Sequence, residues 1–267
     1  NPDAVAKIFA AKGRPSDHPL IVHLADAGQI MTWAREVPKD AIALARAFWP
    51  GPLTLILKRA PSVPDAVTGG QDTVGLRVPG HPVALDLLRA FAAAGGSGGI
   101  AAPSANRFGR ISPTTADHVR EELGDAVSLV LDGGACAVGI ESTILDLSSG
   151  KPVLLRPGHI TPASIESVCG VLPEAPTGAA PRASGTLEAH YAPTTPMRRV
   201  EPGRLLELLN AMRHSGRRCG VLGHSQPPQA GMPHVWRMLP AEPVGYAHDL
   251  YAALRELDHA GVDLIVV

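Results

Sequence analysis

The sequence predicts an α/β (α+β) fold in two unequal domains. Through about residue 170, short apolar runs alternate with helical segments and with glycine or proline punctuation. A stretch rich in Pro, Ala, Gly, Ser and Thr follows, and a shorter β-α-β rhythm comes after it. The 267 residues, 45% of them hydrophobic, can bury a sizeable core. We therefore expect a larger domain over residues 1–171, a connector over 172–197 and a smaller Rossmann-like domain over 198–267.

The larger domain is expected to begin with a helix that ends at Gly13. Asn1 can cap this helix, Pro2 suits its first turn, and glycine tolerates the left-handed conformation that closes a helix. Periodicity and N-caps at Thr114 and Thr161 predict further helices, which cover Ala41–Phe48, Pro82–Ala93, Thr115–Glu122 and Pro162–Val168. The strands are predicted from apolar runs at Leu20–Leu24, Leu53–Leu57, Thr73–Val78, Gly99–Ala102, Val127–Leu131, Thr143–Leu147 and Val153–Arg156.

The smaller domain is expected to alternate helices and strands. Helices are predicted over Arg204–Met212 and Tyr246–Leu257, and strands over Cys219–Leu222 and Val262–Val267. Because the chain opens inside one expected element and closes inside another, we expect the natural protein to extend beyond both ends.

Composition excludes several classes of function. A formal net charge of −1 provides no basic field for wrapping a nucleic acid nonspecifically, and no apolar run is long enough to span a membrane. The three cysteines are widely separated, so the sequence indicates neither a disulfide framework nor a protein-bound metal. We expect a cytoplasmic protein.

Cations recur beside predicted element ends. Lys12 and Arg14 leave the C-terminus of the first helix, where cations are favoured, although such residues are usually solvated caps. Arg77 and Arg156 lie at strand ends, where a guanidinium can hold a carboxylate or phosphate bidentately. The alternative for both is an exposed or ion-paired side chain.

Two turns of small polar residues accompany these cations. Pro103-Ser104-Ala105-Asn106 follows a short strand, and Glu141-Ser142-Thr143 begins another. Such turns let amides and hydroxyls approach an anion closely, although an ordinary turn closed by the asparagine is the alternative. Together, the cations and turns predict a nucleotide site.

The sequence lacks the motifs of several other kinds of site. The sequence contains no P-loop, no G-x-S-x-G elbow and no H-E-x-x-H pair, and a strand follows the glycine run at residues 95–99 where a dinucleotide site needs a helix. His23, considered alone, is more typical of a packed core histidine. We interpret the turn Trp49-Pro50-Gly51-Pro52-Leu53-Thr54 as architectural.

Six ordered motifs together resemble the YrdC/Sua5 family. They are Lys12-Gly13-Arg14-Pro15 with Pro19-Leu20, the turn at residues 49–54, Val74-Gly75-Leu76-Arg77-Val78-Pro79, Pro103-Ser104-Ala105-Asn106, Glu141-Ser142-Thr143-Ile144 and Leu155-Arg156-Pro157-Gly158. The resemblance continues through His190-Tyr191-Ala192-Pro193 and, more weakly, into the smaller domain. It therefore favours the two-domain Sua5 form.

The resemblance implies a fold and an activity. The fold is a YrdC-like twisted, largely mixed sheet with flanking helices, which would form the catalytic domain. The activity is that of a threonylcarbamoyl-AMP synthase, a nucleotidyltransferase that makes threonylcarbamoyl-AMP and pyrophosphate from L-threonine, bicarbonate or CO2, and ATP with Mg²⁺. The product would pass to a tRNA threonylcarbamoyl transferase for tRNA t6A37 biosynthesis, and the resemblance also allows a weak contact with tRNA.

The resemblance also implies roles for individual residues. Lys12 and Arg14 would be catalytic, and Tyr191 would close the connector over the nucleotide. The residues implied to bind ATP are Lys12, Arg14, His18, Thr73, Ala102, Ser112, Arg156 and Tyr191. The residues implied to bind threonine are His23, Arg77, Ser104 and Ser142.

The sequence departs from the family in two places. The family's N-terminal Pro-Thr-x-Thr-Val-Tyr-Gly-Leu segment is missing, and the connector reads Ala183-Ser184-Gly185-Thr186 where the family has a Ser-Pro-Gly-Met-like stretch.

Two alternative functions remain open. One is an RNA-binding module, which the near-neutral charge disfavours. The other is a different carbamoyl-adenylate enzyme on this fold, such as the hydrogenase-maturation type, for which the cysteine spacing offers no support.

Overall fold

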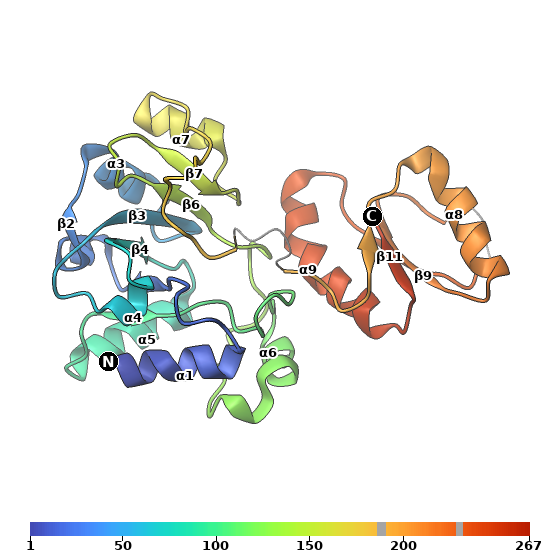
Figure 1. Ribbon diagram of the computed structural model, residues 1–267, viewed down its shortest axis with the longest axis horizontal. Coiled ribbons are helices and arrows are strands. Elements are labelled where there is room, and N and C mark those ends of the chain that lie inside the picture. Colours follow the sequence, from blue (N-terminus) through green and yellow to red (C-terminus); the bar gives the residue numbers. More distant parts are fainter. Residues whose placement is uncertain (186–190, 228–231) are drawn as a thin grey trace.

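The computed structural model describes residues 1–185, 191–227 and 232–267, and Figure 1 shows two domains. Thr186 and His190, which belong to motifs quoted above, lie outside the described residues. A seven-stranded mixed sheet forms the larger domain, and a four-stranded sheet forms the smaller one. The predicted α/β fold class is confirmed.

Parallel and antiparallel pairs alternate across the larger sheet. Its strands are β1 (Ile21–Leu24), β2 (Ala34–Glu36), β3 (Leu53–Arg59), β4 (Thr73–Arg77), β5 (Gly99–Ala101), β6 (Thr143–Asp146) and β7 (Val153–Arg156). The order is β5-β1-β4-β3-β6-β7, with β2 beside β3. The pairs β1–β4 and β3–β6 are parallel, and the others are antiparallel.

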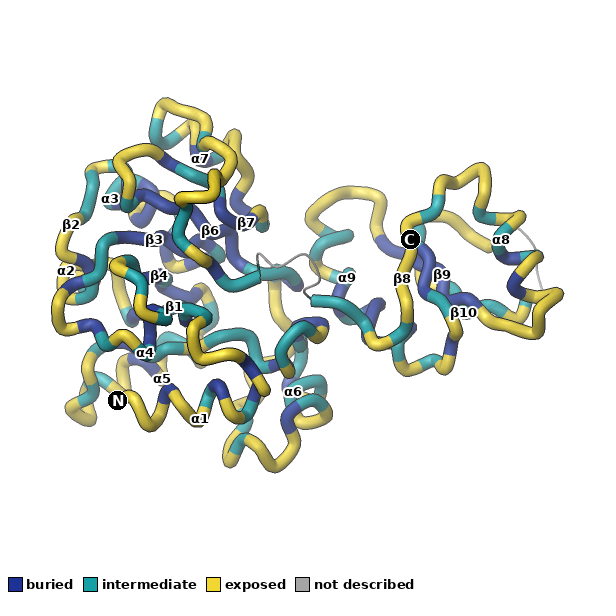
Figure 2. The backbone as a smooth tube through the Cα atoms, in the orientation of Figure 1, coloured by how far each residue is buried: buried dark blue, intermediate teal, exposed yellow. Residues whose placement is uncertain are grey.

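Helices flank this sheet on both sides, with α3 beside α7 on one side and α1 near α4 and α5 on the other (Figure 1). Their bounds are α1 (Pro2–Lys12), α2 (Ile30–Trp33), α3 (Lys39–Phe48), α4 (Asp65–Thr68), α5 (Pro82–Ala93), α6 (Ala116–Leu123) and α7 (Pro162–Cys169), with 3-10 turns η1 (Ala27–Gln29) and η2 (Gly124–Ala126). Because both faces of the sheet are covered, Leu53–Leu57 of the central strand β3 are all buried (Figure 2).

The predicted helix caps are largely confirmed. The Asn1 side chain accepts a hydrogen bond from the Asp3 amide, and Gly13 closes α1 in the left-handed conformation. Thr161 caps α7 as predicted. The cap of α6 is Thr115, not Thr114, because it is the Thr115 hydroxyl that accepts from the His118 amide.

The strand predicted over Val127–Leu131 is wrong. This segment follows η2 as an irregular loop, and Leu129 and Leu131 are 74% and 52% exposed. A strand is stabilised by pairing and by burial of one face, and in the described residues this segment has neither. An apolar run is therefore not enough to predict a strand at this position.

The smaller domain has the predicted Rossmann-like character. It comprises β8 (Met197–Arg198), α8 (Pro202–His214), β9 (Cys219–Gly223), β10 (Val235–Met238), α9 (Pro243–His259) and β11 (Leu264–Val266). Its strands are ordered β10-β9-β11-β8 and all pair in parallel. None of the described helices combines the length and hydropathy needed to cross a membrane.

Helix α9 joins the two domains. It lies between the larger domain and the smaller sheet (Figure 1). Ile111 and Ile140 of the larger domain pack in one hydrophobic cluster with Tyr251 and Leu254 of α9. The domains therefore share a packed apolar interface, which opposes free relative motion.

Candidate functional site

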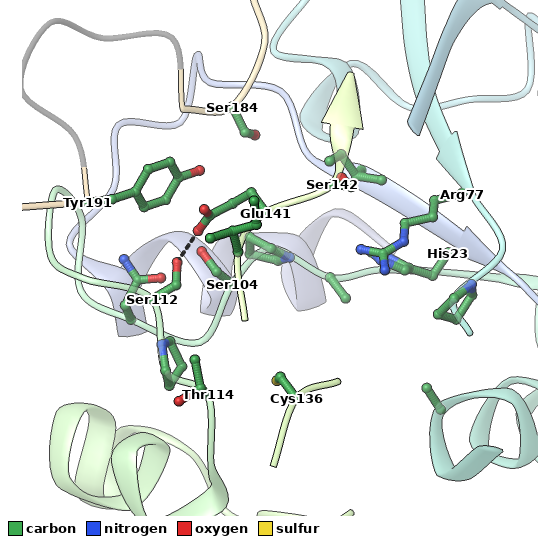
Figure 3. A pocket seen from close by; sticks show the side chains of 18 of the residues that line it. His23, Arg77, Ser104, Ser112, Thr114, Cys136, Glu141, Ser142, Ser184 and Tyr191 are labelled. Carbon is green, nitrogen blue, oxygen red and sulfur yellow. Dashed lines mark hydrogen bonds between the residues drawn. The ribbon is translucent and has the colours of Figure 1, made fainter. Parts of the chain in front are cut away.

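A cavity of about 380 Å³ opens where the ends of β1 and β4 meet the loops before β6 and after β5 (Figure 3). It gathers most of the residues singled out in the sequence. Those that line it are Lys12, Arg14, His23, Arg77, Ala102, Ser104, Ser112, Ser142, Arg156 and Tyr191. The connector and α9 also contribute to its wall, so the cavity is built from both domains.

Two residues implied to bind ATP do not line the cavity. His18 lies just outside, with its ring edge-on to Phe108 at a centroid distance of 5.3 Å. Thr73 begins β4, whereas Arg77 ends it. The four steps from Thr73 to Arg77 span roughly 13 Å, which places Thr73 at the far end of the strand.

Lys12 and Arg14 reach the cavity because α1 ends immediately before it. The Lys12 ammonium donates to the carbonyl oxygens of Ser104 and Asn106, each at 2.5 Å. The Arg14 guanidinium donates to the Pro19 carbonyl at 2.8 Å and to the Ser184 hydroxyl at 3.0 Å. Within the described ranges, no carboxylate lies at salt-bridge distance from either cation.

Burial changes the chemistry of these cations. Lys12 and Arg14 are only 5% and 8% exposed. Loss of hydration and, to a smaller extent, the neighbouring Arg14 charge lower the pKa of Lys12 to about 8. The Nε of Arg14 is buried without a hydrogen-bond partner among the described residues. An anion bound here would restore the favourable interactions that both groups lack.

Arg156, at the end of β7, connects three segments. Its Nε and Nη2 donate to the Ser142 carbonyl at 3.0 and 2.8 Å, and Nη2 also lies 3.1 Å from the Ser142 hydroxyl. Its Nη1 donates to the Ser184 carbonyl at 2.9 Å and to the Tyr191 phenol at 3.0 Å. The connector is thereby fastened over the cavity.

Tyr191 is held in an unfavourable backbone conformation. Its φ is 57°, in the left-handed region that few non-glycine residues adopt. Its phenol lies over Gly185, where a Cβ atom would come within 2.4 Å of the Tyr191 hydroxyl. Burial raises the pKa of Tyr191 to about 12, so the phenol stays protonated at neutral pH.

His23 and Arg77 lie side by side on the parallel strands β1 and β4. The Arg77 Nε donates to the Gly51 carbonyl at 2.9 Å, so the turn at residues 49–54 orients this guanidinium. Burial and the Arg77 charge lower the pKa of His23 to about 3, which makes it a neutral imidazole at physiological pH. Its Nδ1 is buried with no partner among the described residues.

The two small-residue turns play different local roles. Ser142 shares a hydrogen bond with Thr54 at 2.8 Å, which fixes its hydroxyl at the start of β6. The Asn106 amide donates to the carbonyls of Arg107 and Arg110, as expected of an asparagine that closes its own turn. Asn106 therefore shapes the loop that presents Ser104.

Several lining residues were not predicted as site residues. The Glu141 carboxylate accepts hydrogen bonds from the Ser112 hydroxyl and from the phenol of Tyr251 on α9. Glu141 belongs to the motif Glu141-Ser142-Thr143, so the sequence did point to this segment as part of a site. Ser184 and Cys136 also line the cavity. Nothing in the sequence pattern pointed to Tyr251, which lies 110 residues from Glu141.

The arrangement suits two anionic groups in one cavity. Lys12, Arg14 and Arg156 are neighbouring cations in its wall, and Arg77 lies beside neutral His23 on the adjacent strand. Donors fixed on separate elements bind and align anions without reorganising.

Two family models together match nearly all of the chain. The model of Sua5, YciO and YrdC proteins, described as "Telomere recombination", matches residues 1–158. A second model, described as "Threonylcarbamoyl-AMP synthase, C-terminal domain", matches residues 160–267.

Relatives and solved structures agree with these matches. The chain is 38% identical to the threonylcarbamoyl-AMP synthase of Pyrococcus abyssi, over 99% of this chain and 78% of that protein. It is 42% identical to the Bacillus subtilis protein of the same name, over 100% and 78% of the two chains. The crystal structure of P. abyssi Sua5 complexed with L-threonine is similar with a TM-score of 0.89 and 38% identity, over 99% of this chain and 78% of that one. The chain therefore belongs to the Sua5/YciO/YrdC family.

Proposed function

We propose that this protein is a threonylcarbamoyl-AMP synthase, a nucleotidyltransferase that joins L-threonine, CO2 or bicarbonate, and ATP. The observation that carries the proposal is that one cavity holds a cluster of three cations and, on the ends of adjacent strands, a separate arginine beside a neutral histidine. Arg77 and neutral His23 lie together on adjacent strands, whereas Arg14 and Arg156 are hydrogen-bonded to the connector. Lys12, at the end of α1, lies near Arg14. In support, relatives that match along this whole chain bear that name.

Threonine would occupy the part of the cavity at Arg77, His23, Ser104 and Ser142, which we name the amino-acid half. A planar guanidinium held at Nε by the Gly51 carbonyl leaves its terminal nitrogens to bind a carboxylate bidentately. Neutral His23 adds no second charge there and can exchange one hydrogen bond with the substrate.

ATP would occupy the part at Lys12, Arg14, Ser112, Arg156 and Tyr191, which we name the nucleotide half. The buried cations would neutralise the triphosphate and position its α-phosphorus. The connector would cover the nucleotide, because the Ser184 carbonyl and the Tyr191 phenol already accept hydrogen bonds from Arg156. A water-excluding cover strengthens each of these electrostatic interactions.

The residues fit Mg²⁺ that arrives on ATP. Magnesium prefers oxygen ligands, keeps several waters and commonly uses one or two carboxylates beside the phosphates. Glu141 is the acidic side chain that lines the cavity, and the described residues contain no cluster of three metal-ligating groups. Glu141 would therefore hold the ion through one carboxylate. Bound there, Mg²⁺ would supply charge neutralisation to the phosphates.

The reaction requires positioning more than side-chain nucleophiles. The neutral threonine amine adds to CO2 and loses a proton, which gives a carbamate. A carbamate oxygen then attacks the α-phosphorus of ATP, and the bond from that phosphorus to the bridging oxygen breaks, so that pyrophosphate leaves with the electron pair. Holding the two reactants in line supplies most of the acceleration. A tRNA threonylcarbamoyl transferase would consume the product.

Pyrophosphate release tests the proposal. The protein is incubated with Mg-ATP and bicarbonate, and L-threonine is compared with L-serine, L-valine and no amino acid. Release that requires both threonine and bicarbonate, with threonylcarbamoyl-AMP detected by mass spectrometry, supports the synthase. ATP turnover that is indifferent to threonine contradicts it. Salt-dependent binding of bare tRNA, tighter than binding of ATP, would instead favour an RNA-binding role.

A further inference from the structure

We propose that Tyr251, on helix α9 of the C-terminal domain, is a positioning residue for the nucleotide half, because its phenol holds the Glu141 carboxylate against Ser112. The proposal deepens the proposed function and rests on it. It makes the second domain a structural part of the ATP site.

Glu141 is held from two sides. The Ser112 hydroxyl donates to one carboxylate oxygen and the Tyr251 phenol donates to the other. The carboxylate is thereby kept in one orientation in the cavity wall, beside the residues expected to contact ATP (Figure 3). Without the phenol, one carboxylate oxygen would lose its donor and the side chain could rotate.

Tyr251 also supports the connector. Its ring centroid lies 6.1 Å from that of Tyr191, at an interplanar angle of 36°, which is a favourable aromatic contact. One side chain of the second domain therefore contacts both Glu141 and Tyr191.

The helix that carries Tyr251 is firmly attached to the larger domain. One turn along α9, the Arg255 guanidinium donates to the Ile111 carbonyl and pairs with Glu122 at 3.0 Å, with side chains only 6% and 13% exposed. One further turn along, the Asp258 carboxylate accepts from the Thr194 and Thr195 amides at 2.8 and 2.7 Å. These contacts fix the position of α9 relative to both the cavity and the connector.

The backbone confirms how closely α9 approaches the loop before β6. A Cβ atom at Gly139 would come within 2.1 Å of the His248 carbonyl oxygen, so only glycine fits there without displacement. Gly139 precedes Glu141 by two residues. The loop that carries Glu141 is thus seated directly on the helix that carries Tyr251.

Tyr251→Phe tests the proposal, with Tyr246→Phe as its matched control. Tyr246 lies on the same helix, but its ring packs on His224 inside the smaller domain. Loss of one hydrogen bond to a carboxylate should weaken ATP binding by about five- to twentyfold. Calorimetric titration should show threonine affinity within about twofold of wild type. Tyr246→Phe should leave both affinities unchanged.

A double-mutant cycle separates positioning from a general structural effect. If Tyr251 acts through Glu141, then Tyr251→Phe should have no further effect on ATP binding in a Glu141→Ala background. Equal losses of ATP affinity in both backgrounds would overturn the proposal, and so would a Tyr251→Phe variant that binds ATP as the wild type does. A parallel loss of threonine affinity and melting temperature would also overturn it, since that marks a purely structural role.

Wild-type activity distinguishes failure of this proposal from failure of the proposed function. If the wild-type protein releases pyrophosphate only with threonine, while Tyr251→Phe is unaffected in ATP binding, the positioning role alone is rejected. If wild type shows no such dependence, the synthase assignment is rejected whatever Tyr251→Phe does. In that case the assignment of the ATP site is rejected, and the proposed role of Tyr251 is rejected as well.

Discussion

The two halves of the cavity are built in different ways. In the amino-acid half, His23 and Arg77 are neighbours on adjacent strands, and a turn of the same domain holds the Arg77 side chain. In the nucleotide half, Arg14 and Arg156 meet Ser184 and Tyr191 of the connector, and Tyr251 comes from the second domain. One half is therefore set by the sheet, and the other is assembled from three parts of the chain.

This difference predicts which substrate each part of the protein affects. Changes in the connector or in α9 should alter ATP binding and leave threonine binding nearly intact. Changes at the strand ends should do the opposite. Arg156 is an exception, because it contacts both Ser142 of the amino-acid half and Tyr191 of the nucleotide half. Lys12 of the nucleotide half also contacts the amino-acid half, because its ammonium donates to the Ser104 carbonyl.

Arg156→Met should have the largest effect and should abolish the distinction between the halves. The substitution leaves the carbonyls of Ser142 and Ser184 without their donor in a buried site. We expect kcat/KM to fall at least ~10³-fold and the melting temperature to fall by about 5–10 °C.

The control for that variant is Arg35→Met. Arg35 forms an exposed ion pair with Asp72, so its loss should change the melting temperature by less than about 2 °C. Calorimetry and steady-state kinetics measure both variants. If Arg156→Met retained near-normal affinity for either substrate, Arg156 would not connect the halves.

Arg77→Lys should affect the amino-acid half alone. An ammonium cannot make the bidentate contact of a guanidinium with a carboxylate. The KM for threonine should rise about 30-fold or more, and the KM for ATP should stay within about threefold. Exposed Arg89→Lys on α5 is the control. Equal increases in both KM values would reject the assignment of Arg77 to threonine.

Gly185→Ala should affect the nucleotide half alone. Gly185 has a φ of +82°, and an added Cβ would come within 2.4 Å of the Tyr191 hydroxyl. The methyl group should displace Tyr191 and weaken ATP binding by about tenfold, with threonine binding unchanged. Gly178→Ala, in the open part of the connector, is the matched control. An equal loss of threonine affinity would show that the halves are not independent.

The pH dependence of ATP binding should reflect Lys12. Its pKa of about 8 is lowered by burial, so the free protein loses this charge as the pH rises through that value. Phosphates stabilise the ammonium, hence ATP binding takes up a proton above about pH 8, and affinity should fall by up to tenfold per pH unit. Lys12→Arg should flatten the alkaline profile. A wild-type profile that stays flat to about pH 9.5 would contradict this account.

The smallest effect is expected at His23. Because burial lowers its pKa to about 3, the imidazole stays neutral throughout the usual pH range. Threonine affinity, measured by calorimetric titration, should therefore change by less than about twofold between about pH 5.5 and about pH 7.5. A step in affinity near pH 6.5, absent from His23→Gln, would show that His23 titrates.

Local sequence signals predicted helices and their caps better than they predicted which segments pair as strands. Caps such as Asn1 and Gly13 act within one turn, so their signals were correct. The segment Val127–Leu131 was wrong because an apolar run does not say whether a neighbouring strand exists to pair with it. Both helices of the smaller domain were predicted, yet its edge strands β8 and β10 were not.

The candidate site shows the same limit. Lys12, Arg77 and Arg156 were identifiable because each cation stands at an element end beside small or apolar residues. Thr73 stands on the same strand as Arg77, but strand membership does not tell which end faces the cavity. Tyr251 depends on how two domains pack, and no local pattern encodes a contact across 110 residues.

The most direct test of the two-half account is a crystal structure with L-threonine and a nonhydrolysable ATP analogue bound together. We expect the threonine carboxylate on the Arg77 guanidinium, beside His23. We expect the triphosphate between Lys12, Arg14 and Arg156, under Tyr191. A triphosphate seated on Arg77, or threonine seated beneath Tyr191, would contradict it.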